Sequence, residues 1–239
     1  MEREGGRRER GSRARRGALT RPSPPPPPSP PPDVLRALHA AVGHYTELGR
    51  LGMAARQLRD VAETMDKQGD AAGAAEFYEQ AGDLFAGEEQ HAEATKCRLK
   101  VAALAADAGR YSAAAALFED AARAAVDSPL LKYGAKGHLL NAGVCLLAGG
   151  DPVAIGAGLD RFDAVDPSLP GSREGALLRT LASAADCRDV DAFTTALAEF
   201  DAMTRLDAWK TGLLLRAKKG IEGGGAAAGG AGGGEEDLT

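Results

Sequence analysis

The apolar residues that follow position 33 recur at intervals of three and four, which is the spacing of one face of an α-helix. The first such stripe consists of Val34, Leu35, Leu38, Val42 and Tyr45. Asp33 precedes the stripe, and an aspartate at this position can accept hydrogen bonds from the free N–H groups of a first helical turn. The pattern therefore predicts a helix that starts directly after Asp33.

The helical pattern then repeats with a period of 40 residues. The segment from Met53 aligns without a gap on the segment from Glu93, and the first half of a third copy follows at the same offset. The aligned positions include Val61 with Val101, Ala62 with Ala102 and Ala142, Gly69 with Gly109 and Gly149, and Tyr78 with Phe118. Each copy predicts two helices joined at a glycine, and such a pair buries its apolar face only against a neighbouring pair. We therefore expect an all-α solenoid of helical hairpins, with alanines at close helix contacts and the two aromatic residues between layers.

The regularity fades after Asp151, and prolines at 167 and 170 predict a turn. Three shorter helices are expected after it, at about 172–185, 191–203 and 206–221, forming a compact terminal bundle. Its predicted apolar residues are Leu177, Leu178, Leu181, Phe193, Leu197, Phe200, Trp209, Leu213, Leu214 and Leu215, with Trp209 in the core. The chain thus divides into an Arg/Pro-rich segment (1–33), helical repeats (34–165), a terminal helical bundle (166–222) and a Gly/Ala tether with an acidic end (223–239).

Composition and charge exclude several classes of protein. The first 33 residues hold eight arginines against four acidic residues, although the whole chain has a net charge of -5, so the predicted folded part is acidic and a poor candidate for nucleic-acid binding. Proline removes backbone donors, so this segment is expected to be a spacer or disordered; a proline-rich ligand and an organelle transit peptide are the alternatives. No stretch of 18 apolar residues predicts a membrane span.

The residues that could carry chemistry do not form an enzymatic pattern. The four histidines lack HExxH spacing, and neither a GxSxG motif nor a GxxxxGK phosphate loop is present. The histidines are best explained as helix-surface residues. Cys97, Cys145 and Cys187 are far apart and are predicted to be small buried residues in a reducing compartment. We expect no catalytic activity, no metal and no cofactor.

One charge pattern stands out, because Arg56, Lys96 and Lys136 occupy the same position in the three copies. Stacked copies would align them as a basic ladder along one face, with Lys100 one helical turn beyond Lys96. Exposed basic residues are most often ordinary solvated side chains. The alternative is that the ladder binds an elongated acidic partner through several weak, salt-sensitive contacts.

Several ordered blocks resemble the alpha-SNAP family, the soluble attachment proteins of the N-ethylmaleimide-sensitive fusion ATPase. The blocks are FYEQAGDLF at 77–85, ATKCRLKVA at 94–102, LLKYGAKGHLLNAG at 130–143, TRLDAWKTGLLLRAKK at 204–219 and the final EEDL. The resemblance implies tetratricopeptide-like hairpins capped by a C-terminal helical bundle. It also implies an adaptor that binds assembled, syntaxin-type SNARE four-helix bundles and recruits the hexameric ATPase that disassembles them.

The resemblance assigns roles to individual residues. It implies SNARE binding by Arg50, Arg56, Lys96, Lys100 and Lys136, and ATPase stimulation by Asp186, Glu235, Glu236, Asp237 and Leu238. Ser183 and Cys187 stand at neighbouring positions where the family has acidic residues. The implied location is cytoplasmic, peripheral on vacuolar, Golgi and vesicle membranes through the SNAREs.

The chain also departs from the family. The family's further N-terminal helices and its apolar membrane loop have no counterpart, and the Arg/Pro-rich segment stands in their place. We therefore expect little gain in affinity from membranes. A shortened helical-repeat scaffold that binds SNAREs or syntaxin without supporting disassembly is the alternative function.

Overall fold

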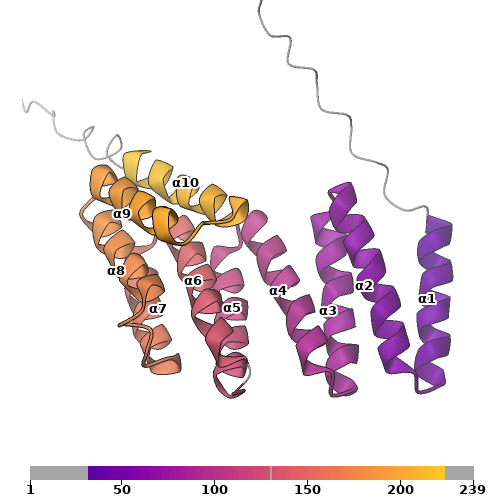
Figure 1. Cartoon of the computed structure of the whole chain (residues 1–239). Helices are drawn as coiled ribbons and strands as arrows, with labels where there is room; N and C mark the ends of the chain where they lie inside the picture. Colours follow the sequence, from indigo (N-terminus) through magenta and orange to yellow (C-terminus); the bar gives the residue numbers. More distant parts are fainter. Residues whose placement is uncertain (1–31, 130, 224–239) are drawn as a thin grey trace, which may run out of the picture.

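The computed structural model describes residues 32–129 and 131–223, and within these residues the secondary structure is entirely helical (Figure 1). The helices are α1 (Pro32–Glu47), α2 (Leu51–Gln68), α3 (Ala71–Gly87), α4 (His91–Asp107), α5 (Tyr111–Val126), α6 (Lys132–Gly149), α7 (Pro152–Val165), α8 (Arg173–Asp186), α9 (Val190–Met203) and α10 (Ala208–Gly223). Successive helices run antiparallel and stand side by side in a row from α1 to α7. The predicted all-α fold of helical hairpins is confirmed.

The joints inside the hairpins use glycine in a left-handed conformation, which other residues rarely adopt. Gly69 and Gly109 have φ of 85° and 80° between α2 and α3 and between α4 and α5. In the third copy the 40-residue period points to Gly149, but Gly149 is the last helical residue and the left-handed residue is Gly150, with φ of 72°. The third hairpin is then completed by α7, whose first turn is capped by the Asp151 side chain, which accepts from the Val153 N–H at 2.9 Å.

The start of the first helix differs from the sequence prediction. The helix begins at Pro32, so Asp33 lies inside its first turn and is not the residue before it. Proline suits a first helical turn because its missing N–H would have no intrahelical partner there, and its fixed φ is already helical.

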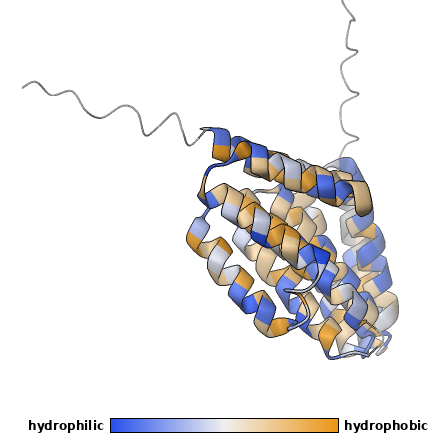
Figure 2. Ribbon diagram, turned by 60° about the vertical axis from the view of Figure 1, so that its left-hand side comes forward, coloured by the Kyte–Doolittle hydropathy of each residue, from blue (hydrophilic) through white to orange (hydrophobic). Residues whose placement is uncertain are grey.

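The packing between the hairpins follows the repeat. Ala62, Ala102 and Ala142 are fully buried, as expected for close contact between helices. Tyr78 is 2% exposed and Phe118 is 3% exposed, so both aromatic side chains fill the space between layers. Apolar residues face neighbouring helices whereas hydrophilic residues lie on outer surfaces (Figure 2).

The predicted terminal bundle is formed by α8, α9 and α10, and it shares one apolar cluster with α4 to α7. Most of the predicted bundle residues are buried or partly buried, but Leu215 is 53% exposed. Trp209 is half-buried at the start of α10 and not a full core residue, because it packs on Phe118 with ring centroids 5.6 Å apart while one side faces a groove. Cys187 is exposed and corrects the expectation of three buried thiols, since it lies just beyond the end of α8.

The position of α10 connects the bundle to the repeats. This helix lies across the ends of α5 and α6, and its first turn approaches α4 (Figure 1). The Arg216 Nη1 donates to the Tyr111 hydroxyl at 3.1 Å, which joins α10 to α5. The first turn of α10 and the middle of α4 thus lie on the same side of the row of helices.

Candidate functional site: a basic face and its groove

The three residues of the predicted basic ladder lie on alternate helices. Arg56, Lys96 and Lys136 lie in the second turns of α2, α4 and α6. Arg56 and Lys96 are exposed, whereas Lys136 is partly buried. Lys100 is exposed one turn beyond Lys96 on α4, and Arg50 is exposed directly before α2.

The ladder residues differ in whether they already have an ionic partner. The Lys96 Nζ lies 2.6 Å from the Glu93 Oε1, within the same helix. Within the described part of the chain, no carboxylate lies within ion-pair distance of Arg56, Lys100 or Lys136. Among the described residues of the ladder, Lys96 is thus the one that already forms an ion pair.

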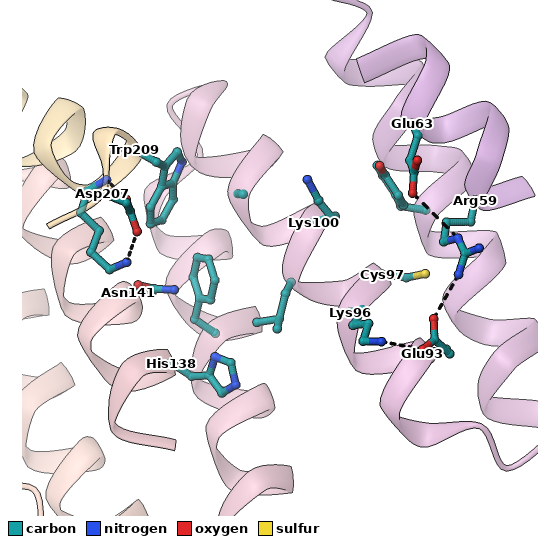
Figure 3. Close-up of a pocket in the computed structure, with 15 residues that line it drawn as sticks. Arg59, Glu63, Glu93, Lys96, Cys97, Lys100, His138, Asn141, Asp207 and Trp209 are labelled. Carbon is teal, nitrogen blue, oxygen red and sulfur yellow. Dashed lines mark hydrogen bonds and ion pairs between the residues drawn. The ribbon is translucent and has the colours of Figure 1, made fainter. Parts of the chain in front are cut away.

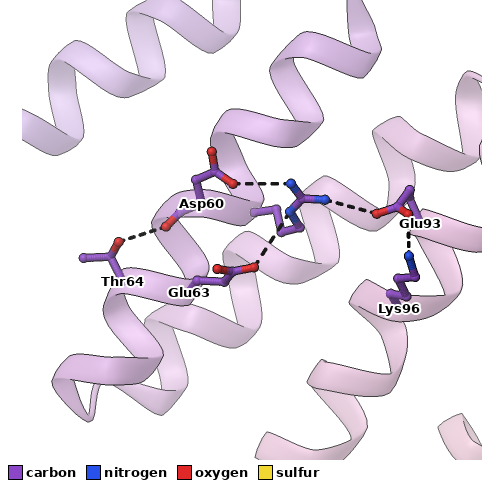
Figure 4. A network of polar contacts seen from close by, with 6 residues as sticks. Asp60, Glu63, Thr64, Glu93 and Lys96 are labelled. Atoms are coloured by element: carbon purple, nitrogen blue, oxygen red, sulfur yellow. Dashed lines mark hydrogen bonds and ion pairs between the residues drawn. The ribbon is translucent and has the colours of Figure 1, made fainter.

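Glu93 also connects α4 to α2 (Figure 4). The Arg59 Nη1 donates to the Glu93 Oε2 at 3.0 Å, while Lys96 occupies the other carboxylate oxygen. The hydrogen bond from Lys96, supported by both positive charges, lowers the pKa of Glu93 even though burial opposes the shift. Glu93 therefore holds one ladder lysine, Lys96, and one further cation, Arg59 of α2.

Sequence reasoning missed Arg59, although the repeat contains a signal for it. With the 40-residue offset, Arg59 falls on Leu99 and Leu139, so it is a charged residue in an otherwise apolar column. Its side chain is 30% exposed and its guanidinium lies 5.9 Å from the centre of the Phe85 ring. Glu63 and Asp60 supply further ionic contacts at 3.9 and 3.5 Å. The period alone does not reveal the role of Arg59, because its main partner, Glu93, belongs to the next repeat.

A groove of about 570 Å³ runs along this face (Figure 3). Lys96 and Lys100 of α4 line the groove between its two sides. Arg59 and Glu63 of α2 form one side, and Trp209 lies on the other side with residues of α6. The basic face is thus hollowed next to two of its predicted binding lysines.

Two titratable side chains at the α10 side of the groove, His138 and Asp207, have pKa values shifted by their surroundings. Burial lowers the pKa of His138, which favours the neutral imidazole. Burial alone would raise the pKa of Asp207, but hydrogen bonds from the Lys210 ammonium and backbone N–H outweigh it and lower the pKa. His138 is half-buried and does not simply lie on a helix surface as expected.

The residues predicted to contact an ATPase are separated from the basic face. Asp186 is the exposed last residue of α8 and lines a different hollow together with Arg188 and Arg216. Ser183 shares this hollow. The predicted tail residues Glu235, Glu236, Asp237 and Leu238 lie outside the described residues.

Two negative findings concern residues 32–129 and 131–223 alone. These residues contain no cluster of three metal-ligating side chains. Their helices also include none with the length and apolar character needed to cross a membrane.

A row of antiparallel helical hairpins, with a basic residue on each alternate helix and a helical bundle at its end, defines an all-α helical-repeat protein. The sequence model described as "Soluble NSF attachment protein, SNAP" matches residues 29–222. The chain therefore belongs to the soluble NSF attachment protein family.

Individual relatives agree with this assignment. The chain is 43% identical to "Alpha-soluble NSF attachment protein" of Vitis vinifera over 207 residues, which cover 87% of this chain and 69% of the relative. It is 36% identical to the Mus musculus protein of the same name, covering 80% of this chain and 65% of that relative. It is 35% identical to "Probable vesicular-fusion protein sec17 homolog" of Schizosaccharomyces pombe, covering 87% and 68%. The chain spans about two thirds of the length of these relatives.

Proposed function

We propose that this chain is an adaptor that binds assembled SNARE complexes and recruits and stimulates the N-ethylmaleimide-sensitive factor, the AAA ATPase that disassembles them. The observation that carries the proposal is the basic face: one cation in the second turn of each of α2, α4 and α6, on a chain of this family. A syntaxin-type four-helix bundle is an elongated acidic partner that could contact several hairpins at once. The adaptor itself has no catalytic step.

The binding energy in this proposal is distributed over several residues. Each exposed ionic contact contributes about 0.2–1 kcal/mol, so Arg50, Arg56, Lys96, Lys100 and Lys136 must act together. Because exposed charges are screened within about 10 Å at 0.1 M salt, the affinity should fall steeply as salt is raised. Membrane association would be peripheral and would follow from the bound SNAREs on vacuolar, Golgi or vesicle membranes.

The ATPase contact in this proposal lies at the other end of the chain. Asp186 and the acidic tail from Glu235 to Asp237 suit a basic surface on the hexamer, and Leu238 supplies an apolar anchor. Full burial of one leucine contributes about 1.5–3 kcal/mol. Leu238→Ala should therefore abolish ATPase stimulation while SNARE binding stays unchanged.

The test of the SNARE contact is a binding titration with a soluble, assembled SNARE bundle at low and moderate salt. Lys100→Glu combined with Lys136→Glu should abolish measurable binding without a change in helicity. Arg98→Glu is the control for charge reversal on α4, because Arg98 is exposed and lies two residues, about 200° of helix, away from both Lys96 and Lys100. Equal loss of affinity in the control and in the double variant would contradict a specific basic face.

A further inference from the structure

The groove on the basic face gathers buried polar atoms that have no hydrogen-bond partner. In the described part of the chain five buried side-chain atoms lack a partner, and four of them belong to residues that line this groove. They are the Arg59 Nε, the Tyr78 hydroxyl, the Asn141 Oδ1 and the Trp209 Nε1. Buried polar atoms are normally hydrogen-bonded, so their concentration around one groove points to a ligand site.

The four residues belong to helices on both sides of the groove. Arg59 comes from α2 and Tyr78 from α3, on one side of α4. Asn141 of α6 and Trp209 of α10 lie on the other side, and both are seen beside the groove in Figure 3. The Arg59 Nε and the Trp209 Nε1 are donors, and a tyrosine hydroxyl can donate as well, so the set favours a ligand rich in acceptors.

The ionic groups of the groove leave one positive charge without a partner. Four cations line it, namely Arg59, Lys96, Lys100 and Lys210, against the three carboxylates Glu63, Glu93 and Asp207. Contacts with these carboxylates engage Arg59, Lys96 and Lys210. Within the described residues, Lys100 alone among the four has no ion pair. A ligand with one negative charge could form an ion pair with Lys100 and so balance the charges of the groove.

The apolar lining of the groove determines the rest of the ligand. Leu99 and Ala103 of α4 lie beside two aromatic rings, Phe118 and Trp209, whose planes are tilted by 58°. Aromatic residues gain from contact with a flat ring in offset or edge-to-face geometry. The volume of about 570 Å³ is within the range of small-molecule sites in proteins.

We propose that this groove binds a small aromatic molecule that carries one anionic group, with the anion at Lys100 and the ring against Phe118 and Trp209. Burial, together with the nearby carboxylate of Glu63, raises the pKa of Tyr78 to about 12, so its hydroxyl remains a donor at neutral pH. The ligand would neutralise Lys100 and so weaken binding of an acidic macromolecule to the basic face. That consequence rests on the proposed function, whereas the site itself does not.

The test uses the full chain and one spectroscopic signal. Trp209 is the single tryptophan of the chain, so a ¹H–¹⁵N spectrum contains one indole N–H resonance that reports on the groove directly. Titration with 2-naphthoate should shift this resonance with a dissociation constant on the order of 100 μM, as expected for a ligand of this size. The uncharged 2-naphthamide, which has the same shape, should bind about tenfold more weakly, because it lacks the charge-assisted contact.

Variants locate the site. Lys100→Gln should weaken 2-naphthoate binding about tenfold and abolish the preference for the anion, whereas Arg98→Gln, the same change on the opposite side of α4, should leave both unchanged. Ala103→Leu should place a bulky side chain where the ligand ring would lie and abolish the shift, while the backbone spectrum remains that of a folded protein. An indole resonance unmoved by 2 mM naphthoate, equal binding of the amide, or binding that survives Ala103→Leu would each overturn the proposal.

Discussion

Lys96 forms an ion pair with Glu93 in the free protein. We therefore predict that removing the negative charge of Glu93 strengthens the binding of an acidic partner. In Glu93→Gln the side chain keeps nearly the same shape but loses its negative charge, so the group formed by Arg59, Glu93 and Lys96 changes its net charge from +1 to +2. Lys96, whose side chain is 69% exposed, no longer has to leave a carboxylate 2.6 Å away in order to meet an acidic partner.

The magnitude follows from the exposure of the pair. An exposed ion pair contributes about 0.2–1 kcal/mol, so Glu93→Gln should raise affinity for a soluble SNARE bundle by a factor of about 1.4 to 5 at low salt. The gain should shrink as salt is raised, because the added charge is screened. Lys96→Gln should reduce affinity more in the Glu93→Gln variant than in the native chain, because without the Glu93 carboxylate Lys96 is fully available to the partner.

The assay is fluorescence anisotropy with a labelled, assembled SNARE bundle at 50 and 300 mM salt. Glu79→Gln is the control for net charge, because Glu79 is an exposed acid on α3 and its loss changes the total charge by the same amount. Affinity that is unchanged or lower in Glu93→Gln, or an equal effect of Lys96→Gln in both backgrounds, would refute the reasoning.

Three further predictions concern stability and thiol reactivity. Gly175→Ala should lower the free energy of unfolding by about 2 kcal/mol in urea titrations, because the new Cβ would lie 2.1 Å from the Leu169 carbonyl oxygen, a backbone atom that cannot move away freely. Gly137→Ala is the control: its Cβ meets nothing within 4 Å, so it should stabilise α6 by about 0.5–1 kcal/mol. An aromatic disulfide reagent should modify one thiol, Cys187, in the folded protein and all three after unfolding, since the other two are buried; rapid modification of three native thiols would contradict this. Glu93 has a folded-state pKa below its ordinary value of 4.5, so its stabilising contribution is complete above that pH and is lost as the pH falls through the lowered pKa. The stability difference between the native chain and Glu93→Gln should therefore shrink as the pH falls below 4.5, and a difference that stays constant with pH would refute the assignment.

The repeat made much of the fold predictable because its information is local. Helix periodicity, the joint glycines and the buried alanines all repeat within 40 residues, and Tyr78 and Phe118 lie between layers as expected. One exception is the end of α6, which runs one residue further than the period indicates, so that Gly150 and not Gly149 is the left-handed residue.

The site was less predictable because it is built from contacts between distant segments. The positions of the ladder cations follow from the period, but the pairing of Arg59 with Glu93 spans 34 residues and depends on how α2 packs near α4. The groove depends on α10, which lies back across the row (Figure 1). This helix brings Trp209 to the same groove as Lys100 (Figure 3), and no local sequence pattern predicts that arrangement. For the same reason the sequence assigned Trp209 to the core.

The measurement that tests the adaptor function most directly is disassembly of a soluble SNARE complex by the purified N-ethylmaleimide-sensitive factor and ATP, with this chain as the only attachment protein. Parallel reactions would contain Leu238→Ala and the double variant of Lys100→Glu with Lys136→Glu. We predict disassembly with the native chain, bound but intact SNAREs with Leu238→Ala, and neither binding nor disassembly with the double variant. SNARE binding without disassembly by the native chain would contradict the adaptor function and indicate a helical-repeat scaffold that binds SNAREs without coupling them to the ATPase.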